Sequence, residues 1–563
     1  MTAAAAPRLR TTERRNPLAL VSDAVDARRA LLVLTALVAI SAALRLFHFH
    51  GFNGFDDAEY ARFAHQMVTG SFPPGDYTGP AVFPLRVGVI VPAAVAFRLF
   101  GMSEWSLAIY PLLASLSGIV LVYLFTAELF GRVGGLIAAS LLAILPGDFD
   151  VATMLLPDLP AAVFAAAAIT CILFAERRLV DHRWQLLAAG VIAGLGFGFA
   201  WLCKESVAYL APFCVAWMII GTRSHGWRQL YLWGGVAAGS LLVLGGEMVA
   251  YSHLHGDALF RFHEVERNYR QWESSFFIEG SEFGWKRGES RAHALVHRLF
   301  VSGPGTILLN RTLLFLPLLG LLATLYAWRR KDRSFLVPGI WLWSLVLMLN
   351  FSSSSMSAYT PLALFQRYLY PLAFAAVSLT AGFIARTVVP GGAYRPLARA
   401  RRLDVAFGAG AALMLVWIGG RQLVWSMRSS SAWYTDVWTV APRVAPSTSI
   451  YSDALSLRGF EFKYGFPRVT AWKDLGRARS AEEIPTGSLV LINPTAIRWL
   501  NKNAGMWVAW PQPGLSRDAG YPLRLAYESP PPTWTRLWTS GDVSLYRVER
   551  TTVLSSTPAR SKS

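Results

Sequence analysis

The sequence predicts a polytopic α-helical membrane protein of about eleven transmembrane helices, followed by a C-terminal soluble domain of mixed α/β type. Three observations support this. Of the 563 residues, 54% are hydrophobic and 16% are charged, whereas soluble domains average about 25% charged residues. Apolar runs long enough to cross a hydrocarbon core, roughly 20 residues each, recur up to residue 427. Beyond that point the apolar segments are short and strand-like.

The predicted spans alternate in direction, starting from a cytoplasmic N-terminal tail of residues 1–29. They are 30–49, 107–128, 133–146, 159–175, 185–202, 206–221, 230–251, 305–328, 335–350, 368–388 and 404–426. Gly131 and Arg132 are expected to form a tight turn. The apolar segment 85–100 contains Pro92 and Arg98, so we expect it to lie in the membrane interface. Residues 50–104 and 252–303 then form long outer loops of a membrane domain that ends at residue 427.

The net charge of +18 is distributed in a way that indicates membrane topology. Basic residues cluster in the short connections assigned to one side: Arg8 to Arg15, Arg177 and Arg178, Arg223 and Arg228, Arg329 to Lys331, and Arg395 to Arg402. This is the positive-inside pattern. It predicts a multi-pass protein of the cell's inner (plasma) membrane with a cytoplasmic N-terminus, and it argues against a nucleic-acid partner.

Residues 428–550 are expected to form a compact extracytoplasmic α/β domain. Strand-like segments lie at 449–452, 488–492 and 543–548, with helix-compatible stretches around 454–463 and 494–502. Residues 551–563 are expected to be a disordered tail.

Ionisable residues gather at the outer ends of the predicted spans, where charge is costly and therefore informative. They are Asp56, Asp57, Asp158, Lys204, Glu205 and Arg367. Each has an ordinary explanation. The aspartates could cap helices, Lys204 and Glu205 could form an interfacial ion pair, and Arg367 could extend to the interface. Because all six lie at one face, beside a basic and aromatic outer loop, we favour a functional site.

Several short motifs along residues 30–390 resemble those of a known family. They are Phe55-Asp56-Asp57-Ala58-Glu59-Tyr60, Phe100 to Glu104, Leu129 to Arg132, Thr153 to Asp158, and Gln366 to Pro371. Together they are similar to GT-C glycosyltransferases, in the group of protein O-mannosyltransferases and lipid A aminoarabinose (ArnT-like) transferases. The resemblance implies a GT-C-type membrane domain that transfers a hexose or pentose from a polyprenyl-phosphate carrier to an acceptor on the outer face.

The resemblance also implies roles for individual residues. Asp56 matches the acid of the first loop, the expected general base or acceptor-orienting carboxylate. Asp57 stands where relatives usually have Glu, Asp158 matches a second outer acid that shapes the sugar and acceptor site, and Arg367 could hold the carrier phosphate. Relatives often carry a Lys-Pro-Pro or His-Pro-Pro element where this chain has Phe83-Pro84-Leu85-Arg86. Arg86 could replace its basic function, and Tyr60, Lys204 and Glu205 complete the expected substrate-binding set.

The chemistry suits these residue types. A carboxylate can accept the proton that a hydroxyl or amine loses as it attacks the anomeric carbon, and cations can stabilise the leaving lipid phosphate. A single displacement would invert the anomeric centre, as the family does. The sequence shows no His/Cys metal cluster, although Asp56 with Asp158 could hold a divalent cation.

Expected partners are a polyprenyl-phosphate-linked sugar, a lipid, glycan or protein acceptor, and the membrane. Two alternatives are a transporter or flippase of lipid-linked sugars and a catalytically silent scaffold for envelope assembly.

Overall fold

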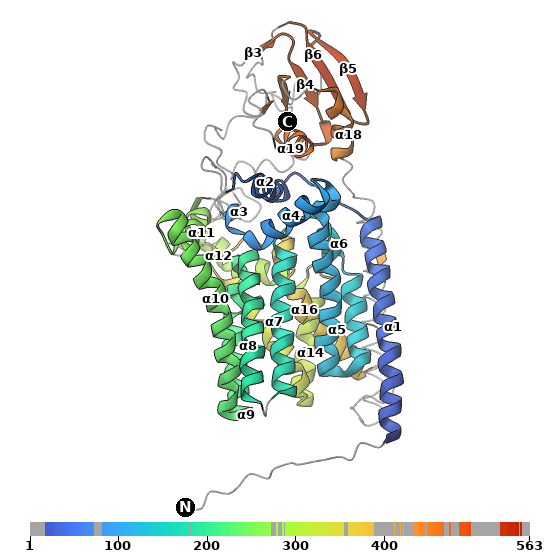
Figure 1. Ribbon diagram of the computed structural model, residues 1–563, viewed down its shortest axis with the longest axis vertical. Coiled ribbons are helices and arrows are strands. Elements are labelled where there is room, and N and C mark those ends of the chain that lie inside the picture. The colour runs from blue at the N-terminus through green and yellow to red at the C-terminus, as the bar shows by residue number, and fades with distance from the viewer. Residues whose placement is uncertain are drawn as a thin grey trace, which may run out of the picture.

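The computed structural model shows a helical bundle that carries, at one end, a layer of short helices and a small β-sheet domain (Figure 1). It describes residues 17–72, 82–179, 182–271, 291–353, 359–387, 433–444, 448–466, 472–474, 483–496, 530–550 and 552–553, with isolated positions in 277–290 and 410–421. We call the end with the short helices the loop end. The opposite end, where α7 and α14 finish in paired arginines, is the arginine end.

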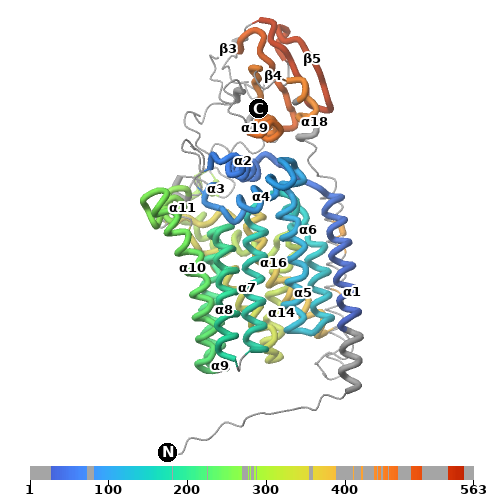
Figure 2. Tube along the Cα trace, in the orientation of Figure 1, coloured from blue at the N-terminus to red at the C-terminus, as the bar shows by residue number. Residues whose placement is uncertain are grey.

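Seven helices in the described part of the chain are long and apolar enough to cross a membrane. They are α1 (Pro17–Phe47), α5 (Glu104–Ala143), α7 (Asp158–Arg178), α8 (Arg183–Cys203), η1 and α9 (Glu205–Leu210 and Ala211–His225), α10 (Gln229–His255), and η5 and α15 (Arg333–Phe335 and Leu336–Phe351). In Figure 2, α10, α8, α7, α5 and α1 stand next to one another across the bundle. The spans predicted in these segments are confirmed.

Helix α5 contains two predicted spans because it folds back on itself. Gly131 within it has φ 84° and ψ 167°, which is not helical. A Cβ on Gly135 would lie 2.8 Å from the carbonyl oxygen of Tyr123. In one continuous helix these residues, twelve positions apart, would be separated by about 18 Å. The chain therefore reverses at Gly131, where the sequence predicted a tight turn.

The predicted single span over 305–328 is wrong. The chain forms α13 (Gly303–Leu308), breaks, and resumes as α14 (Leu316–Arg330). At the break, the side chain of Asn310 accepts the N–H of Leu313 at 3.0 Å, and Leu314 and Phe315 adopt φ values of 52° and 56°. These local hydrogen bonds compete with the helix, and hydropathy alone does not reveal them.

Three other segments complete the comparison with the predicted topology. Helix α4 (Val87–Phe100) is apolar but has only 14 residues, which agrees with an interfacial position. The span predicted at 368–388 consists of η6 (Gln366–Leu369) and the 16-residue α16 (Leu372–Thr387). The span predicted at 404–426 lies outside the described residues, apart from isolated positions. The described residues therefore contain seven apolar helices of spanning length, of which α5 holds two predicted spans, against the predicted total of about eleven spans.

Helices α8 and α10 pack closely through glycines spaced four residues apart. A Cβ added to Gly194 would lie 2.2 Å from the carbonyl oxygen of Val236, and one added to Gly239 would lie 2.2 Å from that of Val191. No side chain fits at such distances. Small residues at four-residue spacing are typical of helix pairs in membranes, where packing rather than apolar burial drives association.

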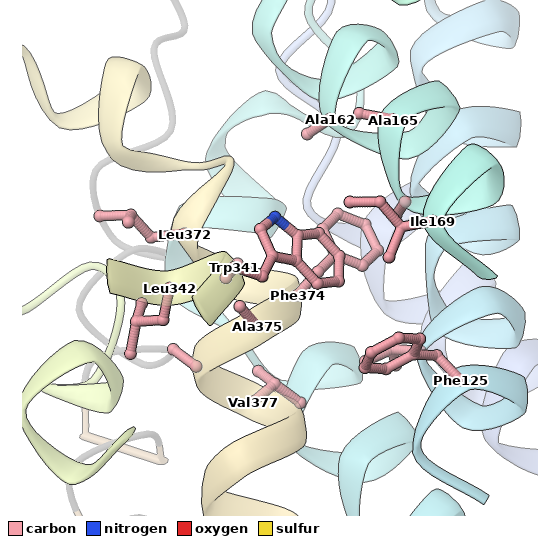
Figure 3. Packing of buried hydrophobic residues seen from close by; sticks show 14 of the residues in the cluster. Phe125, Ala162, Ala165, Ile169, Trp341, Leu342, Leu372, Phe374, Ala375 and Val377 are labelled. Carbon is pink, nitrogen blue, oxygen red and sulfur yellow. The ribbon is translucent and has the colours of Figure 1, made fainter. Parts of the chain in front are cut away.

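The centre of the bundle is an apolar core around Trp341 of α15 (Figure 3). Trp341 is 2% exposed, and its ring is 6.4 Å from that of Phe374 on α16 and 5.5 Å from that of Phe125 on α5. Ile169 of α7 closes the cluster from another side. These side chains pack against one another across four helices, and such packing holds helices together in a membrane, so α5, α7, α15 and α16 form the rigid platform below the loop end.

The loop-end layer consists of short helices between the long ones. They are α2 (Asp56–Thr69), α3 (Val82–Leu85), α4, α6 (Pro146–Val151), α11 (Phe260–Gln271), α12 (Arg291–His297) with η4 (Arg298–Ser302), and η6. Figure 1 shows α2 lying across the top of the bundle, beneath the sheet domain.

The C-terminal domain is a mixed five-stranded sheet in the order β2-β1-β4-β6-β5. Its strands are β1 (Ile450–Ser452), β2 (Trp472–Asp474), β4 (Leu489–Ile492), β5 (Trp534–Ser540) and β6 (Val543–Val548). A separate two-stranded sheet pairs β3 (Glu483–Ile484) with β7 (Thr552–Val553). Strand β1 runs parallel to β2 and β4, and β6 is antiparallel to β4 and β5. The helices α18 (Trp433–Val440), η7 (Ala441–Arg443) and α19 (Ala454–Lys463) complete the domain. The three strands predicted from the sequence are present, and β2, β3, β5 and β7 were not predicted.

Candidate functional site

Asp56 is the first residue of α2 and forms an ion pair with Arg367 of η6. Its carboxylate lies 2.6 Å from a guanidinium nitrogen of Arg367 on η6. Burial alone would lower the pKa of Arg367, but nearby Asp56 and Asp158 raise it, so the guanidinium keeps its charge. The side chains are 12% exposed for Asp56 and 29% for Arg367. The pair is therefore formed yet accessible.

Asp57 points the other way and bonds to the turn before α2. Its carboxylate accepts backbone N–H groups of Asn53, Gly54 and Phe55 at 2.5, 3.3 and 2.8 Å. It is 1% exposed, and burial raises its pKa to about 6 against the opposing effect of these bonds. The residue at the N-cap position is Phe55, without a side-chain cap bond, so Asp57 stabilises the preceding turn rather than capping α2.

Asp158 and Lys204 form a second ion pair beside the first. Asp158 begins α7, and its Oδ1 lies 2.5 Å from the Nζ of Lys204, between α8 and η1. Its other oxygen, Oδ2, is buried without a hydrogen-bond partner among the described residues. The ring of Tyr368 joins the two pairs, because Lys204 Nζ lies 3.7 Å and Arg367 Cζ 5.4 Å from its centroid. The sequence analysis did not single out Tyr368.

Arg86, Tyr60 and Glu205 form the third part of the site. Arg86 lies between α3 and α4 and donates to the Tyr60 hydroxyl at 2.7 Å and to Glu205 at 2.7 Å. Arg261 of α11 approaches the same Glu205 at 3.9 Å and pairs with Glu247 at 2.7 Å. The sequence placed Arg261 in a basic loop, whereas its side chain is 2% exposed.

The structure therefore brings seven of the eight predicted site residues into linked contacts, and only Asp57 faces away. We call these seven, with Tyr368, the site cluster: Asp56, Tyr60, Arg86, Asp158, Lys204, Glu205, Arg367 and Tyr368. Arg86 is 8% and Lys204 5% exposed, so the cluster is more enclosed than a solvated interfacial ion pair.

A second acid–base cluster lies where the loop end of α1 meets α6, and the sequence analysis missed it. Arg45 of α1 pairs with Asp148 of α6, and both side chains are fully buried. Ser115 donates to Asp148 at 2.5 Å, and the hydroxyl of Tyr370 donates to its other oxygen. We call these four residues the closed cluster. Arg45 within an apolar run was the available signal, since a charge at membrane depth needs a partner.

The C-terminal domain contacts α2 through helix α19. Arg458 donates to the carbonyl oxygen of Gly54 at 2.9 Å and to Glu59 at 3.2 Å. Arg62 of α2 pairs with Glu461 at 2.7 Å. The helix that carries Asp56 is thus held in place by contacts with α19 of the C-terminal domain.

Asp56 and Asp158 are each paired with a basic residue of their own, and the expectation that they could share a cation stays a prediction. Within the described residues, ligand-type atoms converge instead at His48, His50 and Asp150. The sequence showed the two histidines but could not show that an aspartate from α6 lies beside them.

Comparisons with known proteins bear on the fold and the family. Residues 91–245 match the model of the family described as dolichyl-phosphate-mannose-protein mannosyltransferase. No curated protein sequence matches the chain. ArnT from Cupriavidus metallidurans, bound to undecaprenyl phosphate, is similar in structure with a TM-score of 0.52 at 16% identity, covering 92% of this chain and 97% of that one.

The Archaeoglobus fulgidus oligosaccharyltransferase is also similar. Its form tethered to an acceptor peptide containing the NVT sequon has a TM-score of 0.53 at 17% identity, covering 92% of this chain and 74% of that chain. Its apo form has a TM-score of 0.50 at 17% identity, and the match covers 77% of this chain but only 64% of that one.

The family match runs from α4 to α10, and the ArnT-like fold extends over 92% of the chain. Both agree with the resemblance inferred from the sequence motifs. Residues 91–245 thus match the family described as dolichyl-phosphate-mannose-protein mannosyltransferase, and the chain as a whole has the fold of ArnT, that of a mostly helical, polytopic membrane protein.

Proposed function

We propose that this chain transfers a sugar from a polyprenyl-phosphate carrier to a hydroxyl or amine acceptor at the loop end. The observation that carries the proposal is the accessible ion pair of Asp56 and Arg367, next to the pair of Asp158 and Lys204. A carboxylate able to take a proton and cations able to hold a phosphate thus lie side by side. The ArnT structure that shares this fold is bound to undecaprenyl phosphate, which supports the choice of donor.

In this reaction one bond forms and one breaks at the anomeric carbon of the sugar. The acceptor oxygen or nitrogen attacks that carbon, its proton passes to the carboxylate of Asp56, and the bond to the carrier phosphate oxygen breaks. The lipid phosphate leaves with the bonding electrons, so a single displacement inverts the anomeric configuration. Asp158 has a spare oxygen, Oδ2, and could accept a hydrogen bond from a sugar hydroxyl.

The cations of the site cluster suit the leaving phosphate. Arg367 and Lys204 both contact the ring of Tyr368, and Arg86 donates a hydrogen bond to the hydroxyl of Tyr60. Guanidinium and ammonium groups fixed where charge develops stabilise the transition state without reorganising. We propose that the bound phosphate replaces part of the ion pairing that Arg367 and Lys204 make with Asp56 and Asp158.

We further propose that the loop end faces the extracytoplasmic side. Helices α7 and α14 finish at the opposite end in Arg177, Arg178, Arg329 and Arg330. Such arginine-rich ends favour the cytoplasm. Polyprenyl-phosphate sugars would then be used on the outer face of the plasma membrane.

The test is transfer of labelled sugar from polyprenyl-phosphate donors in membranes that contain the Asp56→Asn variant. An amide of the same shape cannot accept the proton, and the loss of a general base lowers turnover by roughly 10²–10⁴-fold. A matched control is Asp257→Asn, which alters an exposed aspartate paired with His263 and should transfer normally. Undiminished transfer by Asp56→Asn would refute the proposed role.

The transporter or flippase alternative predicts polar residues at mid-depth that line a route through the bundle. The charged pair of Arg45 and Asp148 lies where the loop end of α1 meets α6, and both side chains are fully buried and bonded within the protein. The family match also favours transfer over transport.

A further inference from the structure

The outer end of α1 meets α6 at a group of three ligand-type side chains. His48 and His50 follow the last residue of α1, Phe47, and Asp150 lies on α6. One ligand atom from each residue lies within 4.8 Å of the other two. The segment is fixed by a backbone bond, in which the N–H of His50 donates to the hydroxyl of Thr153 at 2.9 Å.

The nitrogen atoms of this group suit metal binding. The Nε2 of His50 is buried without a hydrogen-bond partner among the described residues, which is costly for a polar atom. The two imidazole rings meet edge to face, with centroids 4.6 Å apart.

We propose that His48, His50 and Asp150 bind a divalent transition-metal ion, for which Zn²⁺ is the best candidate, at the junction of α1 and α6. Two imidazoles and one carboxylate are a common set of three protein ligands for Zn²⁺, with a fourth position open to water. Tetrahedral ligands of Zn²⁺ lie about 3.3 Å apart, so ligand atoms that now lie within 4.8 Å of one another need to approach by at most about 1.5 Å.

The ion would fasten the two segments that support the site cluster. The chain reaches Asp56 six positions after His50, so fixing His50 fixes the start of the loop that carries Asp56. On the other side, α6 bonds through Asp148 to Tyr370, three positions after Arg367. The proposed metal is thus a positioning site that joins the two supports of the Asp56–Arg367 pair, and it takes no part in the sugar transfer.

The test measures metal directly on the purified full-length protein. After removal of loosely bound ions, we expect close to one zinc per chain by elemental analysis, and Co²⁺ added to the metal-depleted protein should give the visible absorption of a tetrahedral site. His50→Ala and Asp150→Asn should each lose the zinc and the cobalt absorption. Asp150→Asn keeps the shape of the side chain, so it guards against a variant that fails to fold.

Two controls separate this inference from nonspecific binding and from the proposed reaction. His293→Ala removes an exposed histidine that pairs with Glu289, and it should keep the metal. Asp56→Asn should also keep the metal whether or not transfer is lost, so the two proposals fail independently. Wild-type protein without zinc and without cobalt absorption, or Asp150→Asn with an unchanged metal content, would overturn the proposal.

Discussion

The site cluster and the closed cluster are built from the same residue types, but they differ in how completely their polar atoms are bonded. In the closed cluster, Arg45 and Asp148 are fully buried, and hydroxyl groups satisfy the remaining oxygens. In the site cluster, Asp56 and Arg367 keep part of their surface exposed, and Asp158 has one oxygen without a partner among the described residues. A fully satisfied cluster can only hold the bundle together, whereas an incompletely bonded one can exchange partners with a substrate.

The largest effect should come from breaking the closed cluster. Asp148→Asn leaves the buried guanidinium of Arg45 without an opposite charge, which costs about 3–5 kcal/mol of folding stability. We expect a clear fall in the thermal unfolding midpoint and in the yield of folded protein in detergent. Asp56→Asn, in the accessible pair, should lower transfer while the midpoint changes little. A closed-cluster variant of wild-type stability would mean that the two clusters do not differ as described.

The next effect concerns Asp57. Its carboxylate is buried and bonded to the backbone, whereas the carboxylate of its neighbour Asp56 is partly exposed. Burial raises its pKa from an ordinary 3.8 to about 6, so the folded state binds this proton more tightly than the unfolded state does. Its contribution to stability is therefore full below pH 3.8 and is lost as pH rises to about 6. The difference in pKa corresponds to about 3 kcal/mol.

Asp57→Asn removes this titration, so the difference in unfolding midpoint between wild type and variant should change between pH 4 and pH 6 and level off above. The measurement is thermal unfolding of both proteins across that range, with Asp257→Asn as the control. A difference that does not change with pH would show that Asp57 titrates at its ordinary pKa.

The sequence predicted which residues form the site, but it did not predict which partner each side chain bonds to. Charges at the outer ends of apolar runs identified Asp158, Lys204 and Arg367, because ionisable groups at that depth are seldom incidental. Neighbours in a helix point about 100° apart, so residue spacing alone could not decide which of Asp56 and Asp57 faces Arg367, and only the family resemblance favoured Asp56. That choice depends on the turn at residues 53–55, which accommodates only one of the two carboxylates.

Long-range partners were likewise beyond prediction from a single sequence. Arg45 is visible as a charge in an apolar run, but Asp148 reaches it only because α6 folds against α1. The break in the span predicted at 305–328 has in part the same origin. A local bond from the Leu313 N–H to Asn310 and a tertiary bond from the Gly147 N–H to the carbonyl oxygen of Thr312 at 2.9 Å hold the break, and only the second depends on a distant segment. Long apolar helices and the charges at their ends are local features, and these were largely predicted, whereas four of the seven described strands were not.

A smaller effect should follow from Arg367→Met in the site cluster. The variant removes the partner of Asp56 and a proposed phosphate contact, and a hydrogen bond to a charged group contributes about 1.5–3 kcal/mol. We expect kcat/KM for the donor to fall roughly 10- to 100-fold. Arg367→Lys should recover part of this loss because it keeps the charge but not the planar pair of donors. Equal activity of all three proteins would place the phosphate elsewhere.

The smallest effect should come from outside both clusters, at the contact between the C-terminal domain and α2. Arg458→Ala removes the donors to Gly54 and Glu59 but no group that we place against the substrate. Loss of about 1 kcal/mol of positioning should lower kcat a few-fold and leave KM for the donor unchanged, because the cations remain in place. Arg536→Ala, on the exposed face of β5, is the matched control and should behave as wild type. Arg458→Ala could instead raise KM for the acceptor and leave kcat unchanged. That result would mean that the C-terminal domain contacts the acceptor itself, so that the accessible part of the site includes the sheet domain.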